Sequence, residues 1–111
     1  MVLEDLIEEL EKANPDIVCK VGFNNPHSYR GYYDQLAFEP VEDITVGEML
    51  EAAKEALGST YTGWKGGEYT MSEYTDCHLA NRGNTGEELG ATLLKLMILT
   101  RGPGPRNNKF Y

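Results

Sequence analysis

The stretch Thr45-Val-Gly-Glu-Met-Leu-Glu-Ala-Ala-Lys-Glu-Ala-Leu-Gly58 predicts a helix with both ends marked. The Thr45 hydroxyl can cap the N-terminus while Glu48 reaches back, as in the capping-box pattern T-x-x-E. Gly58 suits the left-handed residue that ends many helices. An apolar stripe follows helical spacing, so one face of this helix is expected to be buried. The stripe comprises Val46, Met49, Leu50, Ala53 and Leu57.

The residues before this helix predict a further helix and two strands. An amphipathic helix over residues 2–10 ends at Asn14-Pro15. The first strand is expected from Asp16 to Phe23, a segment rich in β-branched residues. The second is expected from Gly31 to Phe38, and Pro40 is expected to end it. The polar residues Asn24 to Gly31 are expected to form the loop between them.

The residues after the helix add a hairpin, a strand and a third helix. Gly66-Gly67 predicts a turn between strands at Tyr61 to Trp64 and Glu68 to Ser72, and a further strand is expected from Thr75 to Ala80. A second capping box, Thr85-Gly-Glu-Glu88, is expected to open a helix that ends at Leu99. The predicted fold class is α+β: one antiparallel sheet with three helices in a single domain.

The third predicted helix is apolar on more than one side. A sheet of one layer can cover only one side, so the other is a candidate homodimer interface; in the alternative, it packs on the first helix within a monomer. The apolar residues are Leu89, Leu93, Leu94, Leu96, Met97, Ile98 and Leu99. Gly and Pro alternate after Arg101 and cannot continue the helix. Residues 1–102 are expected to form the domain, and residues 103–111 a Gly/Pro-rich tail.

Length and charge narrow the classes of function. A chain of 111 residues fits one domain, and a formal net charge of -8 disfavours binding to duplex nucleic acid. A small anion can still bind where a few cations gather. The apolar stretch Leu93 to Leu99 is far shorter than the roughly 20 residues of a membrane span, and the acidic residues 1–10 do not resemble a signal peptide. We therefore expect a cytosolic protein without a membrane partner.

The supply of catalytic groups is small. Cys77 and His78 are neighbours on a predicted strand, so their side chains should point to opposite faces, which favours a structural role for His78. The other histidine and cysteine, His27 and Cys19, complete no metal-ligand spacing or catalytic motif. The sequence thus predicts two buried, unbridged thiols and a protein that is not an enzyme and holds no cofactor or metal.

Three polar clusters instead indicate ligand contact. In residues 24–31, Arg30 can grip a phosphate and Tyr29 or Tyr32 can stack on a base; a surface turn with Arg30 in an ion pair is the alternative. Residues 61–74 are dense in aromatic and hydroxyl groups, which favours ligand contact. The alternative is ordinary hairpin packing, with Trp64 at the edge of the core. Residues 81–86 would precede the third helix and could hold an anion at its N-terminus, unless Thr85 and Glu88 satisfy its donors themselves. Together they predict a binding module for a nucleotide-sized anion.

Four segments resemble a family of small bacteriophage proteins, the Thoeris anti-defence sponges. They are Gly31-Tyr-Tyr-Asp-Gln-Leu-Ala-Phe-Glu-Pro40, Thr45-Val-Gly-Glu-Met-Leu50, Gly63-Trp-Lys-Gly-Gly-Glu-Tyr-Thr-Met-Ser-Glu-Tyr74 and Leu79-Ala-Asn-Arg-Gly-Asn84. The resemblance covers about residues 21–99. It implies a protein of the host cytoplasm that binds, without cleaving, cyclic ADP-ribose isomers made by TIR-domain immune enzymes, in pockets at a dimer interface. Some members also form hexamers and hold cyclic oligonucleotides at separate sites.

The resemblance also implies ligand-binding residues. Arg30, Tyr74 and Asn84 match pocket positions, and Arg101 could complete a phosphate clamp. Further candidates are Arg82 and Lys65 from the same segments, Lys65 with a structural role as its alternative, and, from the polar residues 24–31 themselves, Tyr29. Two other functions stay open: an enzyme that degrades such nucleotides, and an acidic inhibitor that binds a host defence protein.

Overall fold

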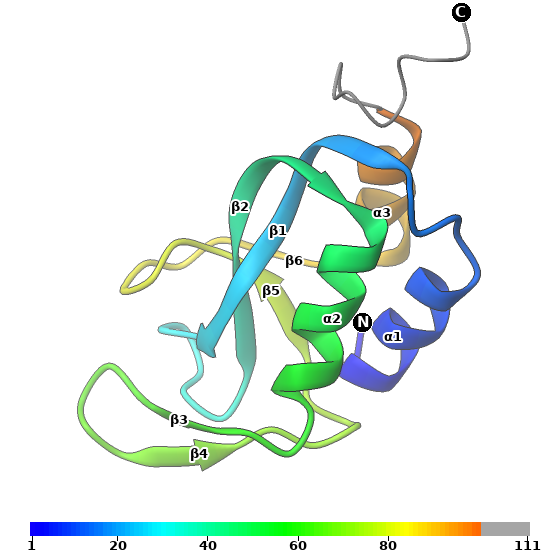
Figure 1. Cartoon of the computed structure of the whole chain (residues 1–111). Coiled ribbons are helices and arrows are strands. Elements are labelled where there is room, and N and C mark those ends of the chain that lie inside the picture. Colours follow the sequence, from blue (N-terminus) through cyan, green and yellow to red (C-terminus); the bar gives the residue numbers. More distant parts are fainter. Residues whose placement is uncertain (101–111) are drawn as a thin grey trace, which may run out of the picture.

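The computed structural model describes residues 1–100, which form three helices and six strands (Figure 1). Their order is α1 (Leu3–Glu11), β1 (Val18–Ser28), β2 (Leu36–Thr45), α2 (Val46–Ala56), β3 (Thr60–Thr62), β4 (Glu68–Thr70), β5 (Cys77–Leu79), β6 (Glu87–Glu88) and α3 (Ala91–Leu99). The predicted α+β class is confirmed. Both the helix before Asn14 and the Gly66-Gly67 hairpin form as predicted.

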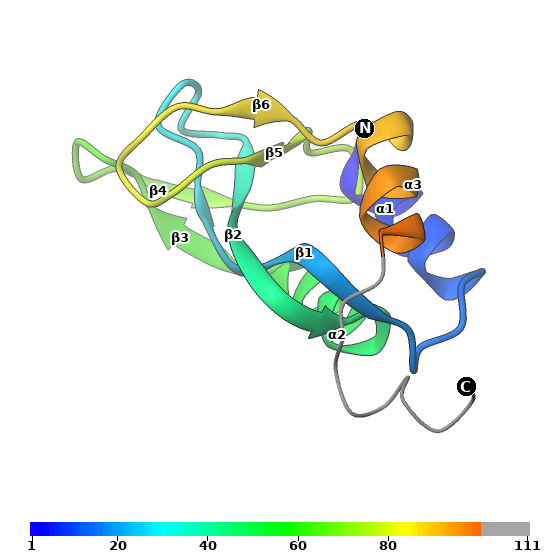
Figure 2. The same cartoon turned by 90° about the horizontal axis from the view of Figure 1, so that it is seen from above.

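The main sheet has the strand order β1-β2-β5-β6, and β3 pairs with β4 in a separate hairpin. The pairs β1/β2 and β5/β6 are antiparallel as expected, but β2 and β5 run parallel, with α2 and the hairpin lying between them in the chain. Parallel neighbours require such a crossover connection. Seen from above, the three helices gather at one end and side of the molecule, and the β3–β4 and β5–β6 loops lie at the other end (Figure 2).

Strand β1 is longer than predicted, because it runs through residues 24–28, which were expected to be a loop. The register between β1 and β2 shifts between Asn24 and His27, and Asn25 has a positive φ of 55°. A bulge of this kind absorbs an extra residue without ending the strand. Pro26 is tolerated because β1 lies at the edge of the sheet, where a missing N–H breaks no ladder.

Strand β2 begins later and ends later than predicted. Residues 31–35 form a turn rather than a strand, and β2 continues past Pro40 to Thr45. Strand β5 pairs only with Leu36, Ala37 and Phe38, so Pro40 faces no partner on that side of β2. The proline therefore does not interrupt a ladder there, and the strand passes through it.

The two predicted capping boxes have different outcomes. At Thr45 the hydroxyl accepts the Glu48 N–H at 3.1 Å and the Glu48 carboxylate accepts the Thr45 N–H at 3.1 Å, which confirms the first box. The second box, at Thr85 and Glu88, is wrong. Glu87 and Glu88 form β6 instead, and α3 begins at Ala91 after an N-cap glycine. The strand pairing wins because it lets Leu89 enter the core.

This difference gives a direct test by mutation. Replacing Thr45 with alanine should lower the free energy of unfolding by about 1 kcal/mol, because the N–H of Glu48 loses its acceptor. Thr85 is the matched control, since it caps nothing and is exposed; Thr85→Ala should change stability by less than about 0.5 kcal/mol. Urea unfolding of both variants measures the difference, and equal losses would contradict the assignment of the caps.

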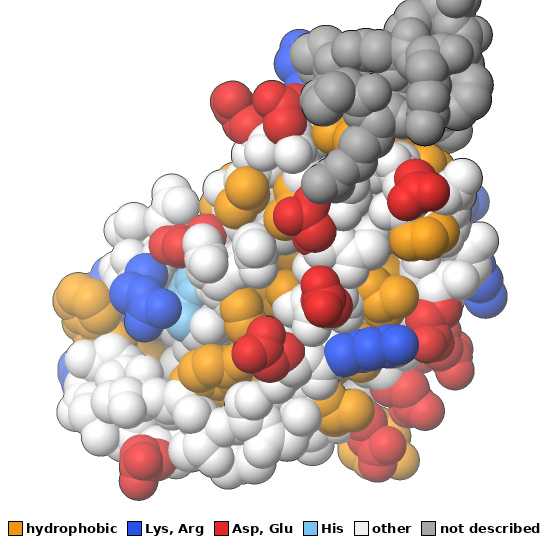
Figure 3. Space-filling model, in the orientation of Figure 1, with side chains coloured by type: hydrophobic (Ala, Val, Ile, Leu, Met, Phe, Trp, Pro, Cys, Tyr) orange, Lys and Arg blue, Asp and Glu red, His pale blue; other side chains and the backbone are white. Residues whose placement is uncertain are grey.

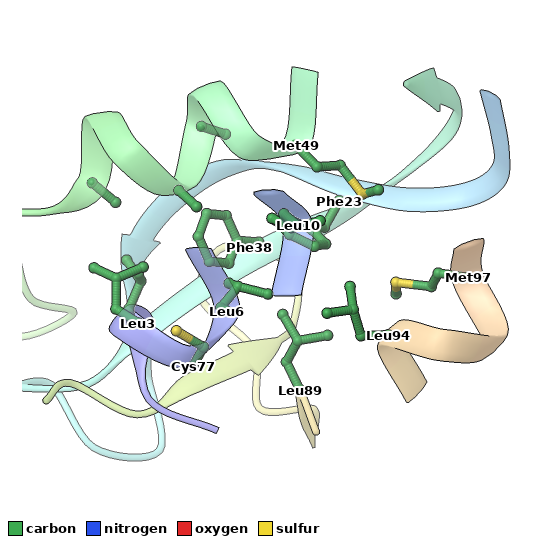
Figure 4. Packing of buried hydrophobic residues seen from close by; sticks show 14 of the residues in the cluster. Leu3, Leu6, Leu10, Phe23, Phe38, Met49, Cys77, Leu89, Leu94 and Met97 are labelled. Atoms are coloured by element: carbon green, nitrogen blue, oxygen red, sulfur yellow. The ribbon is translucent and has the colours of Figure 1, made fainter. Parts of the chain in front are cut away.

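The core lies between one face of the sheet and the three helices (Figure 4). Phe23 and Phe38 are fully buried with ring centroids 4.6 Å apart, and Leu3, Leu6 and Leu10 of α1 pack toward them. Helix α3 contributes Leu94 and Met97 to the core, while Leu96 and Leu99 are 56% and 73% exposed. One apolar side of α3 is thus buried in the core, and Leu96 and Leu99 on the other side are covered by nothing within residues 1–100.

Candidate functional site

A cavity of about 280 Å³ opens where three chain segments meet at the end of the sheet away from α3. The segments are the end of β1, the β3–β4 loop and the β5–β6 loop. Figure 3 shows cationic side chains beside a histidine and a large apolar side chain on this side of the molecule. The cavity is lined by His27, Ser28, Arg30, Thr62, Gly63, Trp64, Arg82 and Gly83.

Arg30 and Arg82 give this cavity its positive charge. Within residues 1–100 neither guanidinium forms an ion pair, although the described chain holds many more acidic than basic side chains. The alternative of Arg30 as a surface ion pair is therefore not what the structure shows. Two guanidiniums without carboxylate partners can offer their N–H donors to an external anion such as a phosphate.

Trp64 forms an aromatic wall of the same cavity. The guanidinium carbon of Arg30 lies 5.1 Å from the centroid of the indole ring, within the range of a cation–π contact. On the side of the β5–β6 loop, a Cβ on Gly83 would lie 2.6 Å from a carbon of the same ring, and Gly83 has a positive φ of 79°. Glycine is therefore required there, and the indole rests on the backbone while staying 57% exposed.

Tyr29, which is buried next to the cavity, holds two of the segments that form it in place. Its hydroxyl donates to the Gly86 carbonyl at 3.1 Å and accepts the Gly86 N–H at 3.2 Å, which joins the segment after β1 to the β5–β6 loop. Its ring stacks on His78, with centroids 3.9 Å apart, and His78 Nε2 lies 2.6 Å from the Gln35 amide oxygen. Burial lowers the pKa of His78, against the opposing effects of Glu88 and Asp76. These contacts are typical of a histidine with a structural role.

The other predicted site residues do not line this cavity. Tyr74 lines a second cavity of about 380 Å³, together with Asp34 and Asp76. Asn84 is exposed in a turn in which its N–H donates to the Asn81 carbonyl, and Lys65 is exposed at the tip of the hairpin. Arg101 and the tail from residue 103 lie outside the described residues. Of the predicted residues, the structure brings Arg30 and Arg82 together.

The expected anion site at the start of the third helix is wrong. Residues 81–86 connect β5 to β6, and β6 separates them from α3, so they do not face a helix N-terminus. Glu88 lies 3.5 Å from the amino group of Met1 instead of capping a helix. Arg82 still contributes to the site, but through the cavity beside Trp64.

Comparison of the chain with protein-family models, curated proteins and solved structures finds no match in any of the three.

Two features bear on chemistry elsewhere in the chain. Both cysteines are buried without a disulfide, as predicted, and burial raises the pKa of the Cys77 thiol to about 12, which leaves it protonated at neutral pH. In the described part of the chain, no three His, Cys, Asp or Glu side chains gather closely enough to hold a metal ion. No described helix has the length and apolar character needed to cross a bilayer.

Trp64 and His27 also line the cavity, although neither is among the individual binding residues predicted from the sequence. The sequence places Trp64 in the aromatic cluster 61–74, with packing at the edge of the core as the alternative, and His27 in the polar cluster 24–31. The signal for Trp64 lay in Gly83, because a glycine next to Arg82 allows a ring to approach the backbone. The inward position of His27 depends on the β1 bulge, which no local pattern marks.

Proposed function

We propose that this protein binds a cyclic ADP-ribose-type nucleotide and sequesters it without cleavage, as a phage anti-defence protein acting on TIR-derived immune signals. The observation that carries the proposal is the cavity lined by an exposed indole and by two guanidiniums that form no ion pair within residues 1–100. Guanidiniums match the oxygens of a pyrophosphate, and an indole face matches a purine ring. The sequence resemblance supplies the choice among nucleotides.

The size of the cavity limits how much of the ligand it holds. At about 280 Å³ it falls just below the range of about 300–1,000 Å³ that is typical of small-molecule sites. The cavity would accommodate the phosphates and part of the sugar. The base would then lie over the exposed face of Trp64, at the rim. Ligand binding of this kind displaces Arg30 from the indole and pairs it with phosphate.

Thermal unfolding tests the proposal without a prior choice of isomer. A panel of cyclic ADP-ribose isomers and cyclic oligonucleotides is added to the full chain, and the ligand that binds should stabilise it by about 2.7 kcal/mol at 100 times its dissociation constant. The bound ligand is then released by heat and analysed by mass spectrometry. Intact ligand supports sequestration, a cleaved product supports the enzyme alternative, and no shift with any nucleotide supports an inhibitor of a host protein.

We also propose that the protein is a homodimer formed through the open side of α3. Leu96 and Leu99 are large, apolar and more than half exposed there. Helix α3 lies at the end of the molecule opposite the β3–β4 and β5–β6 loops, so a dimer through α3 alone would not join two of the cavities described above (Figure 2). Dimerisation and ligand capture are therefore independent in this proposal.

Replacing Leu96 with glutamate tests the dimer. The charge would have to be buried in the interface, so a folded monomer is expected. Light scattering measures the mass, and Lys95→Glu, which also adds negative charge on α3 at an exposed position but removes no apolar side chain, is the control. A Leu96→Glu protein with the same mass as the wild type would rule out this interface.

A further inference from the structure

His27 is a buried polar side chain in the wall of the positively charged cavity. It is only 3% exposed, although it comes from a segment of asparagines, a proline and a serine. The register shift of β1 between Asn24 and His27 turns the residue inward and pairs it with Ala37 of β2. His27 therefore occupies the face of the sheet opposite the main core, on which Ala37 and Tyr29 also pack.

One ring nitrogen of His27 has a partner and the other has none in residues 1–100. Nδ1 lies 2.9 Å from the carbonyl oxygen of Asn25. A carbonyl oxygen can only accept, so Nδ1 carries the hydrogen in this contact. In the neutral ring Nε2 is then an acceptor, and no described residue donates to it. A buried acceptor without a donor is rare in folded proteins and requires an explanation.

The neighbouring cations do not supply the donor that Nε2 of His27 lacks, but they restrict which ligand could supply it. Arg30 and Arg82 have only donors, and these are matched by the oxygens of a phosphate. An ionised phosphate diester or pyrophosphate bridge offers acceptors alone, so it cannot satisfy an acceptor nitrogen. With the His27 ring neutral, a ligand that fits both kinds of group carries a hydrogen-bond donor next to its phosphate. In a nucleotide, the hydroxyls of the ribose are in that place.

We infer that Nε2 of His27 accepts a hydrogen bond from a ribose hydroxyl of the bound nucleotide, so that the cavity selects phosphorylated ribose over phosphate alone or a deoxyribose. The inference rests on the proposed function, since it assigns a specificity-determining residue to the same site. It places the sugar between the arginines, which hold its phosphate, and Trp64, which holds the base. His27 thereby distinguishes ligands that the two arginines alone would bind equally.

Isothermal titration with cyclic ADP-ribose, and with analogues that each lack one ribose hydroxyl, tests this role. In His27→Asn the side-chain amide can keep the bond to the Asn25 carbonyl but is too short to replace Nε2. We expect this variant to bind cyclic ADP-ribose about tenfold more weakly than the wild type, the loss of about one hydrogen bond. One deoxy analogue should bind the wild type about tenfold more weakly too, yet bind His27→Asn no worse than cyclic ADP-ribose does.

The controls separate this inference from the proposed function. His27→Gln restores an acceptor oxygen near the position of Nε2 and should recover part of the lost affinity, while unchanged unfolding midpoints show that both variants keep the fold. If all deoxy analogues lose the same factor in the wild type and in His27→Asn, Nε2 does not contact a hydroxyl and the inference fails while nucleotide binding stands. If the wild type binds no cyclic ADP-ribose isomer, the proposed function fails, and the inference fails with it.

Discussion

Replacing Arg30 or Arg82 with alanine is expected to weaken nucleotide binding by about 1.5 to 3 kcal/mol per residue, the range for hydrogen bonds to charged groups. Each substitution leaves a phosphate charge without its partner inside the cavity that both arginines line. Arg30→Ala also removes the guanidinium that lies 5.1 Å from the Trp64 ring, so the tryptophan fluorescence of the free protein should change in this variant alone. Isothermal titration with the isomer found in the thermal panel measures both losses.

Lys65→Ala is the matched control for charge. Lys65 is exposed at the tip of the hairpin next to Trp64 and is not among the residues that line the cavity, so its removal lowers the positive charge without changing the site. Its effect on binding should be small and should vanish at high salt, because exposed charges are screened. Equal losses for all three variants would mean that net charge, rather than the cavity, controls binding; near wild-type binding by both arginine variants would contradict the site itself.

The elements that could be predicted from the sequence are those whose signals are local. The Thr45 and Glu48 side chains act on backbone groups within one helical turn, and Gly66-Gly67 sets a hairpin turn by itself. The errors fall where a distant strand decides the outcome. Thr85 and Glu88 have the same capping pattern, but pairing of β6 with β5 overrides it. Strand β1 continues through Pro26 because it lies at the sheet edge, and edge position is a property of the whole topology.

In the candidate site, too, local chemistry could be predicted from the sequence and contacts between distant segments could not. The chemistry of Arg30 and Arg82 could be predicted, because a guanidinium beside glycines and aromatics is visible in the sequence. That the two arginines line one cavity could not be predicted, since it depends on the hydrogen bonds between Tyr29 and Gly86 and on Trp64 lying against Gly83. For the same reason Tyr74 was grouped with Arg30, although the structure places it in a different cavity. Loops that share a residue type need not share a site.

Replacing Phe38 with alanine is expected to lower the free energy of unfolding by about 3 to 5 kcal/mol, which is a large part of the total stability of a small domain. Phe38 lies in β2, fully buried, with its ring 4.6 Å from that of Phe23 and with helices α1 and α2 packed over the same core. Truncation removes buried apolar area and leaves a cavity that two strands and two helices cannot close without breaking the sheet register.

Urea unfolding followed by circular dichroism measures this loss as a lower transition midpoint with an unchanged slope. Tyr32→Ala is the control, because it also truncates an aromatic ring, but one that is 66% exposed, and should change stability by less than about 0.5 kcal/mol. Phe38→Leu keeps most of the volume and should fall between the two. A loss below about 1 kcal/mol for Phe38→Ala would mean that Phe38 is not at the centre of the core, and the register of β2 with β1 and β5 would then be in error.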